Sequence, residues 1–190
     1  METRVSGFAI PLRWQWLLAA MVAGMLARAT HPQTLIWTGF IFGLAQWGVL
    51  YAVLRRRGRL AHLLWLPATG ISGLAGYLLI ASFGVHVLGP VLIALTAPYQ
   101  NFASHLIFLT LLWTVIGLGQ WPLLQNVLPI ARRWVWLSAA GGATGAVIDL
   151  ALQLAGLEIF TSLVAGMLAG AAYGLVTGRA IAQLKGGNYN

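Results

Sequence analysis

The sequence contains no cysteine and very few acidic residues. Of its 190 residues, 3 are Asp or Glu and 11 are Lys or Arg, and charged residues make up only 7% of the chain. The lack of cysteine excludes disulfide bonds, a thiolate nucleophile and a Cys-ligated metal. A soluble domain carries about 25% charged residues, because its surface must face water. The low charge and a mean hydropathy of +0.83 therefore predict a membrane protein whose surface is covered by lipid.

Residue patterns for catalysis or metal binding are also missing. The sequence has no paired carboxylates of the glycosidase kind and no Gly-x-Ser-x-Gly turn. Its four histidines show neither the i, i+4 spacing nor the HExxH pattern of zinc sites. We therefore expect no enzyme activity, no metal site and no cofactor. The one alternative is His105, which could ligate the metal of a chlorophyll or a haem.

Six apolar segments dominate the chain, and each is long enough to cross a hydrocarbon layer of about 30 Å as a helix. They are residues 12–29, 34–54, 63–83, 104–128, 134–154 and 159–182. Helices are expected because lipid offers no hydrogen-bond partner to the backbone. The stretch 84–101 contains a shorter apolar run between Pro90 and Pro98. It predicts a re-entrant or interfacial piece.

Basic residues predict the orientation. With six spans, every Lys and Arg except Arg28 falls on the side of the two termini. The positive-inside rule then places both termini in the cytoplasm, with the chain in a bacterial inner membrane. The same distribution accounts for the net charge of +8, so the expected partner is the lipid bilayer and not a nucleic acid.

An internal repeat predicts the architecture. "RWQWLLAA" (13–20) and "RWVWLSAA" (133–140) are identical at six of eight positions, and "HLLWLPAT" (62–69) is a looser copy. "GLAQWGVL" (43–50) likewise matches "GLGQWPLL" (117–124), with "GAAYGLVT" (170–177) in the equivalent place. We therefore expect one all-α transmembrane domain over residues 1–190. It would be a six-helix bundle of three hairpins, about 12–57, 60–130 and 132–184, with pseudo-threefold symmetry.

Tryptophans and glycines suggest structural roles. Five tryptophans near the predicted cytoplasmic boundary are interpreted as interfacial anchors, or alternatively as stacking surfaces for a ligand or pigment: Trp14, Trp16, Trp65, Trp134 and Trp136. Small residues let membrane helices approach closely. Two sets of glycines at four-residue spacing therefore predict helix packing: Gly39 and Gly43, then Gly166, Gly170, Gly174 and Gly178.

Polar residues inside the spans are candidates for a functional site. Gln46 and Gln120 occupy matching repeat positions, and Asp149 is the one carboxylate inside a predicted span. The glutamines could simply hydrogen bond between helices, or both could line a polar site. Asp149 could pair with Arg28 at the outer end, or it could couple to a proton or cation.

Two resemblances add expectations. The Gly-Leu-x-Gln-Trp phrases at 43–47 and 117–121, each followed by a Trp-containing helix start, resemble a group of uncharacterised bacterial polytopic membrane proteins. That resemblance implies a bacterial, membrane-embedded, repeat-built chain. "LVAGMLAGAAYGLVTG" (163–178) is similar to the last helix of the substrate-binding subunits of energy-coupling-factor vitamin transporters, which are also small six-helix proteins.

Function is predicted only by class. The scarcity of charge in the spans favours a non-enzymatic structural or accessory subunit of a membrane complex, with other membrane subunits as partners. Gln46, Gln120 and Asp149 favour instead a subunit that binds or transports a small solute. A pigment- or lipid-binding protein is the second alternative, because the chain has nine tryptophans and His105.

Overall fold

A computed structural model describes residues 10–29, 35–56, 60–91, 100–125, 131–156 and 158–186. Within these ranges the chain forms helices and short turns, without a strand, which confirms the predicted all-α class. The elements are α1 (Leu12–Ala29), α2 (Leu35–Arg56), α3 (Ala61–Leu79), the π-helix η2 (Ile80–Leu88), α5 (Gln100–Leu124), α6 (Ala131–Leu154) and α7 (Glu158–Gly186). The long helices lie close to the predicted apolar segments.

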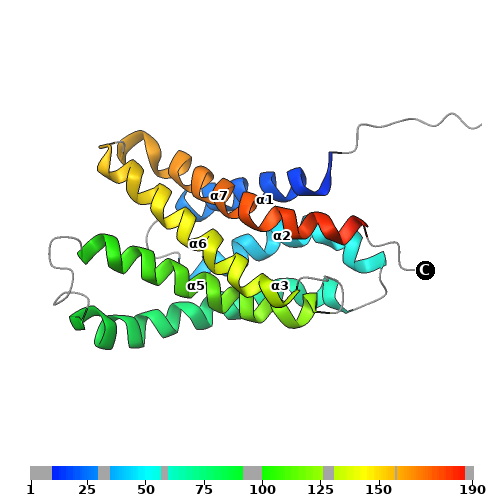
Figure 1. Cartoon of the computed structure of the whole chain (residues 1–190), viewed down its shortest axis with the longest axis horizontal. Helices are drawn as coiled ribbons and strands as arrows, with labels where there is room; N and C mark the ends of the chain where they lie inside the picture. Colours follow the sequence, from blue (N-terminus) through cyan, green and yellow to red (C-terminus); the bar gives the residue numbers. More distant parts are fainter. Residues whose placement is uncertain are drawn as a thin grey trace, which may run out of the picture.

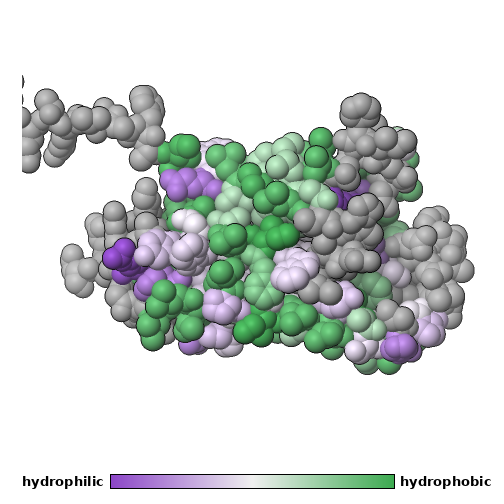
Figure 2. Space-filling model, turned by 180° about the vertical axis from the view of Figure 1, so that it is seen from behind, coloured by the Kyte–Doolittle hydropathy of each residue, from purple (hydrophilic) through white to green (hydrophobic). Residues whose placement is uncertain are grey.

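Within the described ranges, four helical stretches are long and apolar enough to cross a membrane. They are Ala61–Gly84, Phe102–Leu124, Ala131–Leu152 and Leu163–Gln183. Large apolar side chains also cover the outside of the molecule: Ile71 is 63% exposed, Trp136 75% and Leu154 81%. Figure 2 shows hydrophobic residues over much of the coloured surface of one face, with hydrophilic residues mainly towards its two sides. An exposed apolar surface of this extent is typical of contact with lipid or another apolar partner, as the composition predicts.

The long helices run roughly along the long axis of the molecule (Figure 1), and their contacts close into a ring. Each helix packs against the next one along the chain, and α1 closes the ring against α7. Because successive helices run in opposite directions, α1 begins and α7 ends at the same end of the molecule. We call this end the basic end, since the arginines at the helix termini gather there: Arg13, Arg55, Arg132, Arg133 and Arg179.

Glycines allow the closest helix contacts. A Cβ atom added to Gly73 of α3 would lie 2.6 Å from the Cα of Gly39 of α2. Gly24 of α1 and Gly166 of α7 meet backbone to backbone in the same way, and so do Gly170 and Ala20. Apolar side chains gain little by leaving lipid for another helix, so close backbone approach is a main source of helix association in a membrane.

The other predicted packing glycines lie on the contact of α2 with α3 and on the contact of α1 with α7. Gly43 faces Thr69 of α3, and Gly174 faces Leu17 of α1. Gly178 has more room, because a Cβ there would lie 3.5 Å from Trp16. The stripe on α7 therefore packs tightly over residues 166–174 and more loosely at its end.

The helix that begins at Ala61 runs further than the sequence predicts. It continues through η2 to residue 91, so residues 84–91 are a helical extension of α3, and their re-entrant or interfacial position stays a prediction. Residues 92–99 of that stretch lie outside the described residues. The continuation satisfies the backbone in lipid, and Gly84 lets the helix pass α5, because a Cβ there would lie 2.9 Å from the ring of Phe108.

Candidate functional site: a buried polar layer and a cavity

A chain of buried hydrogen bonds joins four helices. Trp134 Nε1 of α6 donates to Gln120 Oε1 of α5 at 2.9 Å. The amide nitrogen of Gln120 donates to Gln46 Oε1 of α2 and to Thr69 Oγ1 of α3, both at 3.0 Å. The Thr69 hydroxyl donates to the carbonyl oxygen of Trp65 at 2.8 Å. An indole N–H can only donate, so the Trp134 bond fixes the direction of every bond that follows.

Further interhelical bonds lie on α6 and α7. Ser138 Oγ and Tyr173 OH are 3.2 Å apart, and Trp16 Nε1 of α1 donates to Thr177 Oγ1 of α7 at 2.8 Å. We call these buried side chains the polar layer: Gln46, Thr69, Gln120, Ser138, Tyr173 and Thr177. Interhelical hydrogen bonds in membranes contribute roughly 0.6–1.7 kcal/mol each. This geometry favours the interpretation of the two glutamines as interhelical hydrogen bonders.

Three of the five predicted anchor tryptophans lie inside the protein. Trp16, Trp65 and Trp134 are 1% exposed or less, and the rings of Trp16 and Trp134 pack edge to face at 6.0 Å. A side chain without lipid contact cannot anchor the protein at the interface, so the prediction is wrong for these three. Trp14 and Trp136 are 43% and 75% exposed and remain compatible with it.

The polar layer lies between the basic end and a cavity of about 580 Å³. Residues of α1, α2, α5, α6 and α7 line this cavity. On α6 its lining runs from Gly141 to Asp149, about 12 Å along the helix at 1.5 Å per residue. The deep wall is aromatic. The rings of Phe42 and Trp113 are 4.7 Å apart, and those of Trp113 and Tyr173 are 4.1 Å apart.

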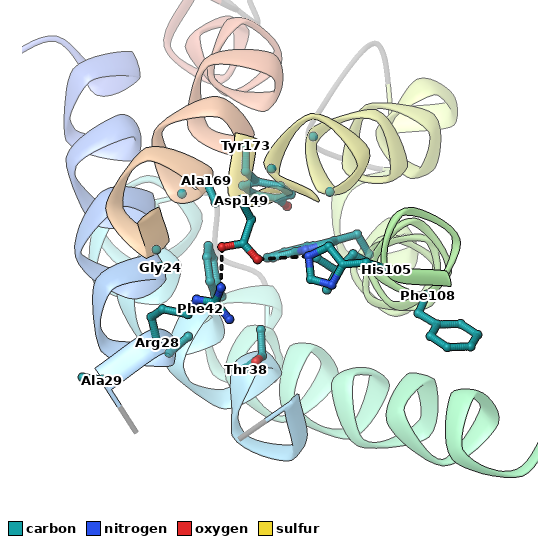
Figure 3. Close-up of a pocket in the computed structure, with 18 of the residues that line it drawn as sticks. Gly24, Arg28, Ala29, Thr38, Phe42, His105, Phe108, Asp149, Ala169 and Tyr173 are labelled. Carbon is teal, nitrogen blue, oxygen red and sulfur yellow. Dashed lines mark hydrogen bonds and ion pairs between the residues drawn. The ribbon is translucent and has the colours of Figure 1, made fainter. Parts of the chain in front are cut away.

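The outer end of the cavity carries an ion cluster. Figure 3 shows the Asp149 carboxylate between Arg28 of α1 and His105 of α5. Arg28 Nη2 donates to Asp149 Oδ1, and His105 Nε2 lies 3.0 Å from Asp149 Oδ2. The side chains of Arg28 and His105 are 40% and 31% exposed, whereas that of Asp149 is 7% exposed. The cluster is thus a partly open mouth above a buried carboxylate, with the Arg28 partner that the sequence predicts.

The predicted polar site is split by the structure. Gln46 and Gln120 meet in the polar layer and do not line the cavity, whereas Asp149 does. Sequence reasoning did not place Tyr173 and Trp113 in a site, although Tyr173 stands where the other copies have glutamine. That replacement of an amide by an aromatic ring was the available signal for the cavity.

His105 has one ring nitrogen already engaged by Asp149, so ligation of a haem or chlorophyll metal would need the other nitrogen. Over the ranges the structure describes, no group of three His, Cys, Asp or Glu side chains could hold a metal ion. Comparison with models of protein families, with curated proteins and with solved structures finds no match. A functional assignment therefore depends on the geometry of the polar layer and the cavity.

Proposed function

We propose that this chain is a multi-pass membrane protein that binds one small, mostly apolar molecule in the cavity. The observation that carries the proposal is a cavity of about 580 Å³ with apolar walls and its charged side chains at one end. Small-molecule sites typically have volumes of about 300–1,000 Å³ and apolar walls with a few placed polar groups. This favours the binding of a small solute over a purely structural role.

The packing around the cavity supports a preformed site. Tyr173 and Trp113 are held against glycines of α6: a Cβ on Gly141 would lie 2.7 Å from the Tyr173 ring, and one on Gly142 would collide with the Trp113 ring. Both rings therefore pack closely against the backbone of α6. Small-molecule sites are typically concave, apolar and largely preformed, and this hollow has those features.

We propose further that the six long helices are three copies of one hairpin. In each copy the first helix carries a buried tryptophan, a buried small residue four positions later and a buried glycine eight positions later. These are Trp16, Ala20 and Gly24 in α1, Trp65, Thr69 and Gly73 in α3, and Trp134, Ser138 and Gly142 in α6. We call this alignment of the three copies the buried register; it matches Trp16 with Trp134. The alignment with the most identical residues, 13–20 with 133–140, instead matches Trp16 with Trp136.

Contacts between the hairpins support the same register. Equivalent positions meet at the three junctions α2–α3, α7–α1 and α5–α6. The first set is Gly39 with Gly73, Gly166 with Gly24, and Trp113 with Gly142. The second set, one turn away, is Gly43 with Thr69, Gly170 with Ala20, and Gly117 with Ser138. Such agreement is what a pseudo-threefold arrangement about the membrane normal requires.

The basic end is proposed to face the cytoplasm. Because the chain has no cysteine, single-cysteine variants can test this orientation without background. Leu60→Cys lies exposed at the basic end, and Ala155→Cys lies exposed at the opposite end. A membrane-impermeant maleimide should label Ala155→Cys in intact cells and Leu60→Cys only after lysis. The opposite pattern would overturn the orientation.

Native mass spectrometry after mild detergent extraction from the native membrane tests ligand binding. The wild-type chain should carry a small molecule of defined mass. Thr38→Phe should lose it, because Thr38 is 9% exposed and lines the cavity, with its side chain directed toward the space shown in Figure 3. Thr38→Val, which keeps the shape, and Ile71→Phe, which adds a ring on the exposed surface, should both retain it.

The same spectra can contradict the proposal. A wild-type chain that carries no small molecule and is bound to a stoichiometric protein partner would favour the accessory-subunit prediction instead. Retention of the molecule by Thr38→Phe at wild-type occupancy would show that it binds outside the cavity.

A further inference from the structure

The mouth of the cavity contains a cation whose hydrogen-bond donors are only partly used. A guanidinium group has five N–H donors. Arg28 lines the cavity and donates to Asp149 Oδ1 through Nη2. Its remaining donors meet no acceptor among the described residues, and its side chain is 40% exposed. Arg28 can therefore bind a second acceptor without giving up Asp149.

The acidic partner is already occupied. Asp149 Oδ1 accepts from Arg28, Oδ2 lies 3.0 Å from His105 Nε2, and the side chain is 7% exposed. An ammonium group entering the cavity would meet the more exposed Arg28 guanidinium before it reached the buried carboxylate. Charge and access at the mouth therefore disfavour a cation.

We infer that the ligand is an organic anion, in which a carboxylate binds Arg28 and a flat apolar body fills the cavity behind it. This inference rests on the proposed function. Guanidinium groups bind carboxylates through paired, charge-assisted hydrogen bonds, which gain strength where water is excluded. The charged groups that face the carboxylate are Arg28, His105 and Asp149.

The shape of the body follows from the walls. Beyond the mouth, the lining includes the aromatic side chains Phe42, Trp113 and Tyr173, together with glycines of α1, α6 and α7 and smaller side chains such as Thr38 and Ala169. Ring faces favour stacking with another ring. A planar ring system fits such a space better than a branched alkyl chain.

Three naphthalene probes of similar size test the head group: naphthylacetate, naphthylacetamide and naphthylethylamine, which are anionic, neutral and cationic. Thermal unfolding of the purified protein in detergent is measured with each. Naphthylacetate should raise the Tm by roughly 3–6 °C for every tenfold excess over its Kd. The amide should have a smaller effect and the amine none. Thr38→Phe corrects for uptake of probe by the micelle, since its cavity is filled.

Variants of the mouth should move naphthylacetate affinity in opposite directions. Arg28→Gln should weaken binding at least about tenfold, because the charge-assisted bonds are lost. Asp149→Asn should keep or tighten binding, because it removes a negative charge beside the carboxylate. The Asp149→Asn result keeps the inference testable if Arg28→Gln does not fold. Equal stabilisation by the amine, or unchanged naphthylacetate affinity in Arg28→Gln, would overturn it.

Failure of this inference differs from failure of the proposed function. If no probe changes the Tm but native mass spectra show a small molecule in the wild-type chain, the anionic aromatic class is wrong and the cavity remains a binding site. If the spectra also show no bound molecule, both proposals fail.

Discussion

The contact between α2 and α3 gives a direct test of the packing, through the substitution Gly39→Ala. A methyl group at this position would lie 2.8 Å from the Cα of Gly73 and 2.7 Å from the carbonyl oxygen of Thr69. Both neighbours are backbone atoms, so neither can move aside like a flexible side chain. An ordinary contact needs at least 3.4 Å, and the two helices must therefore separate by more than half an ångström.

The cost can be estimated from the packing. Inserting a methyl group into a filled interior destabilises a protein by about 1–3 kcal/mol. At roughly 2–4 °C per kcal/mol for a chain of this size, the Tm should fall by roughly 2–12 °C. The change in helix propensity works in the other direction, since alanine is favoured over glycine by up to about 1 kcal/mol in a helix. Thermal unfolding of the purified protein in one detergent measures the difference.

Gly48→Ala is the matched control. Gly48 lies on the same helix, and a Cβ there would meet nothing within 4 Å, so this variant should unfold at or above the wild-type temperature. The double variant Gly39→Ala/Gly73→Ala should cost less than the two single variants together, because both methyl groups require the same separation. The reasoning is refuted if Gly39→Ala and Gly48→Ala have the same Tm.

Three further outcomes follow from the interior. Gln120→Leu should lower the free energy of unfolding by about 1–3 kcal/mol, because it leaves Trp134 Nε1 and Gln46 Oε1 without partners. Gln46→Leu should lower it less. Equal losses for the two variants in thermal unfolding would argue against the hydrogen-bond directions given above for the polar layer. Trp134→Phe should destabilise the fold and Trp136→Phe should not, since the two side chains are 1% and 75% exposed. A lower Tm for Trp136→Phe than for Trp134→Phe would contradict the burial of Trp134. Asp149→Ala should destabilise the protein more than Asp149→Asn, because alanine cannot accept the hydrogen bond that Arg28 donates. Indistinguishable Tm values would show that the cluster has no structural role.

The helices could be predicted from the sequence because lipid leaves the backbone no alternative. Segment 12–29 became α1 (Leu12–Ala29), and residues 134–154 lie inside α6 (Ala131–Leu154). The end of α3 could not be predicted in this way. The sequence predicts an apolar segment that ends at residue 83 and a separate piece over 84–101. The helix instead continues to residue 91, and the absence of a side chain at Gly84 leaves room for Phe108 of α5.

The inward face of each helix was harder to predict than the helix itself. In water, apolar side chains mark the buried face, but in a membrane the lipid-facing and buried faces are both apolar. Trp16 and Trp14 therefore look alike in the sequence, although one is fully buried and the other 43% exposed. The polar residues gave better guidance, because an amide such as Gln120 must find a partner inside the protein.

In the proposed repeat, the three hairpins diverge in the polar layer. α2 and α5 contribute Gln46 and Gln120, whereas α7 contributes Tyr173 at the position that the proposed alignment makes equivalent. The phenol reaches Ser138 with its hydroxyl group and stacks its ring on Trp113. One face of the layer is thus aromatic, and that face is the deep wall of the cavity. A third glutamine would supply an amide but no ring for this wall.

The proposed repeat also accounts for the asymmetry of the cavity. In its alignment Trp113 matches Gly39 and Gly166, which have no side chain, whereas the Trp113 ring lines the cavity. Arg28 lies twelve residues after the buried Trp16 of α1. The residue twelve positions after the buried Trp134 of α6 is Ala146. If three similar hairpins enclose a space on a pseudo-threefold axis, identical residues would line it three times over and offer no single polar end. On the proposed repeat and the proposed ligand binding, the positions at which the copies differ, such as Arg28 and Trp113, are those at which we expect substitutions to change the ligand.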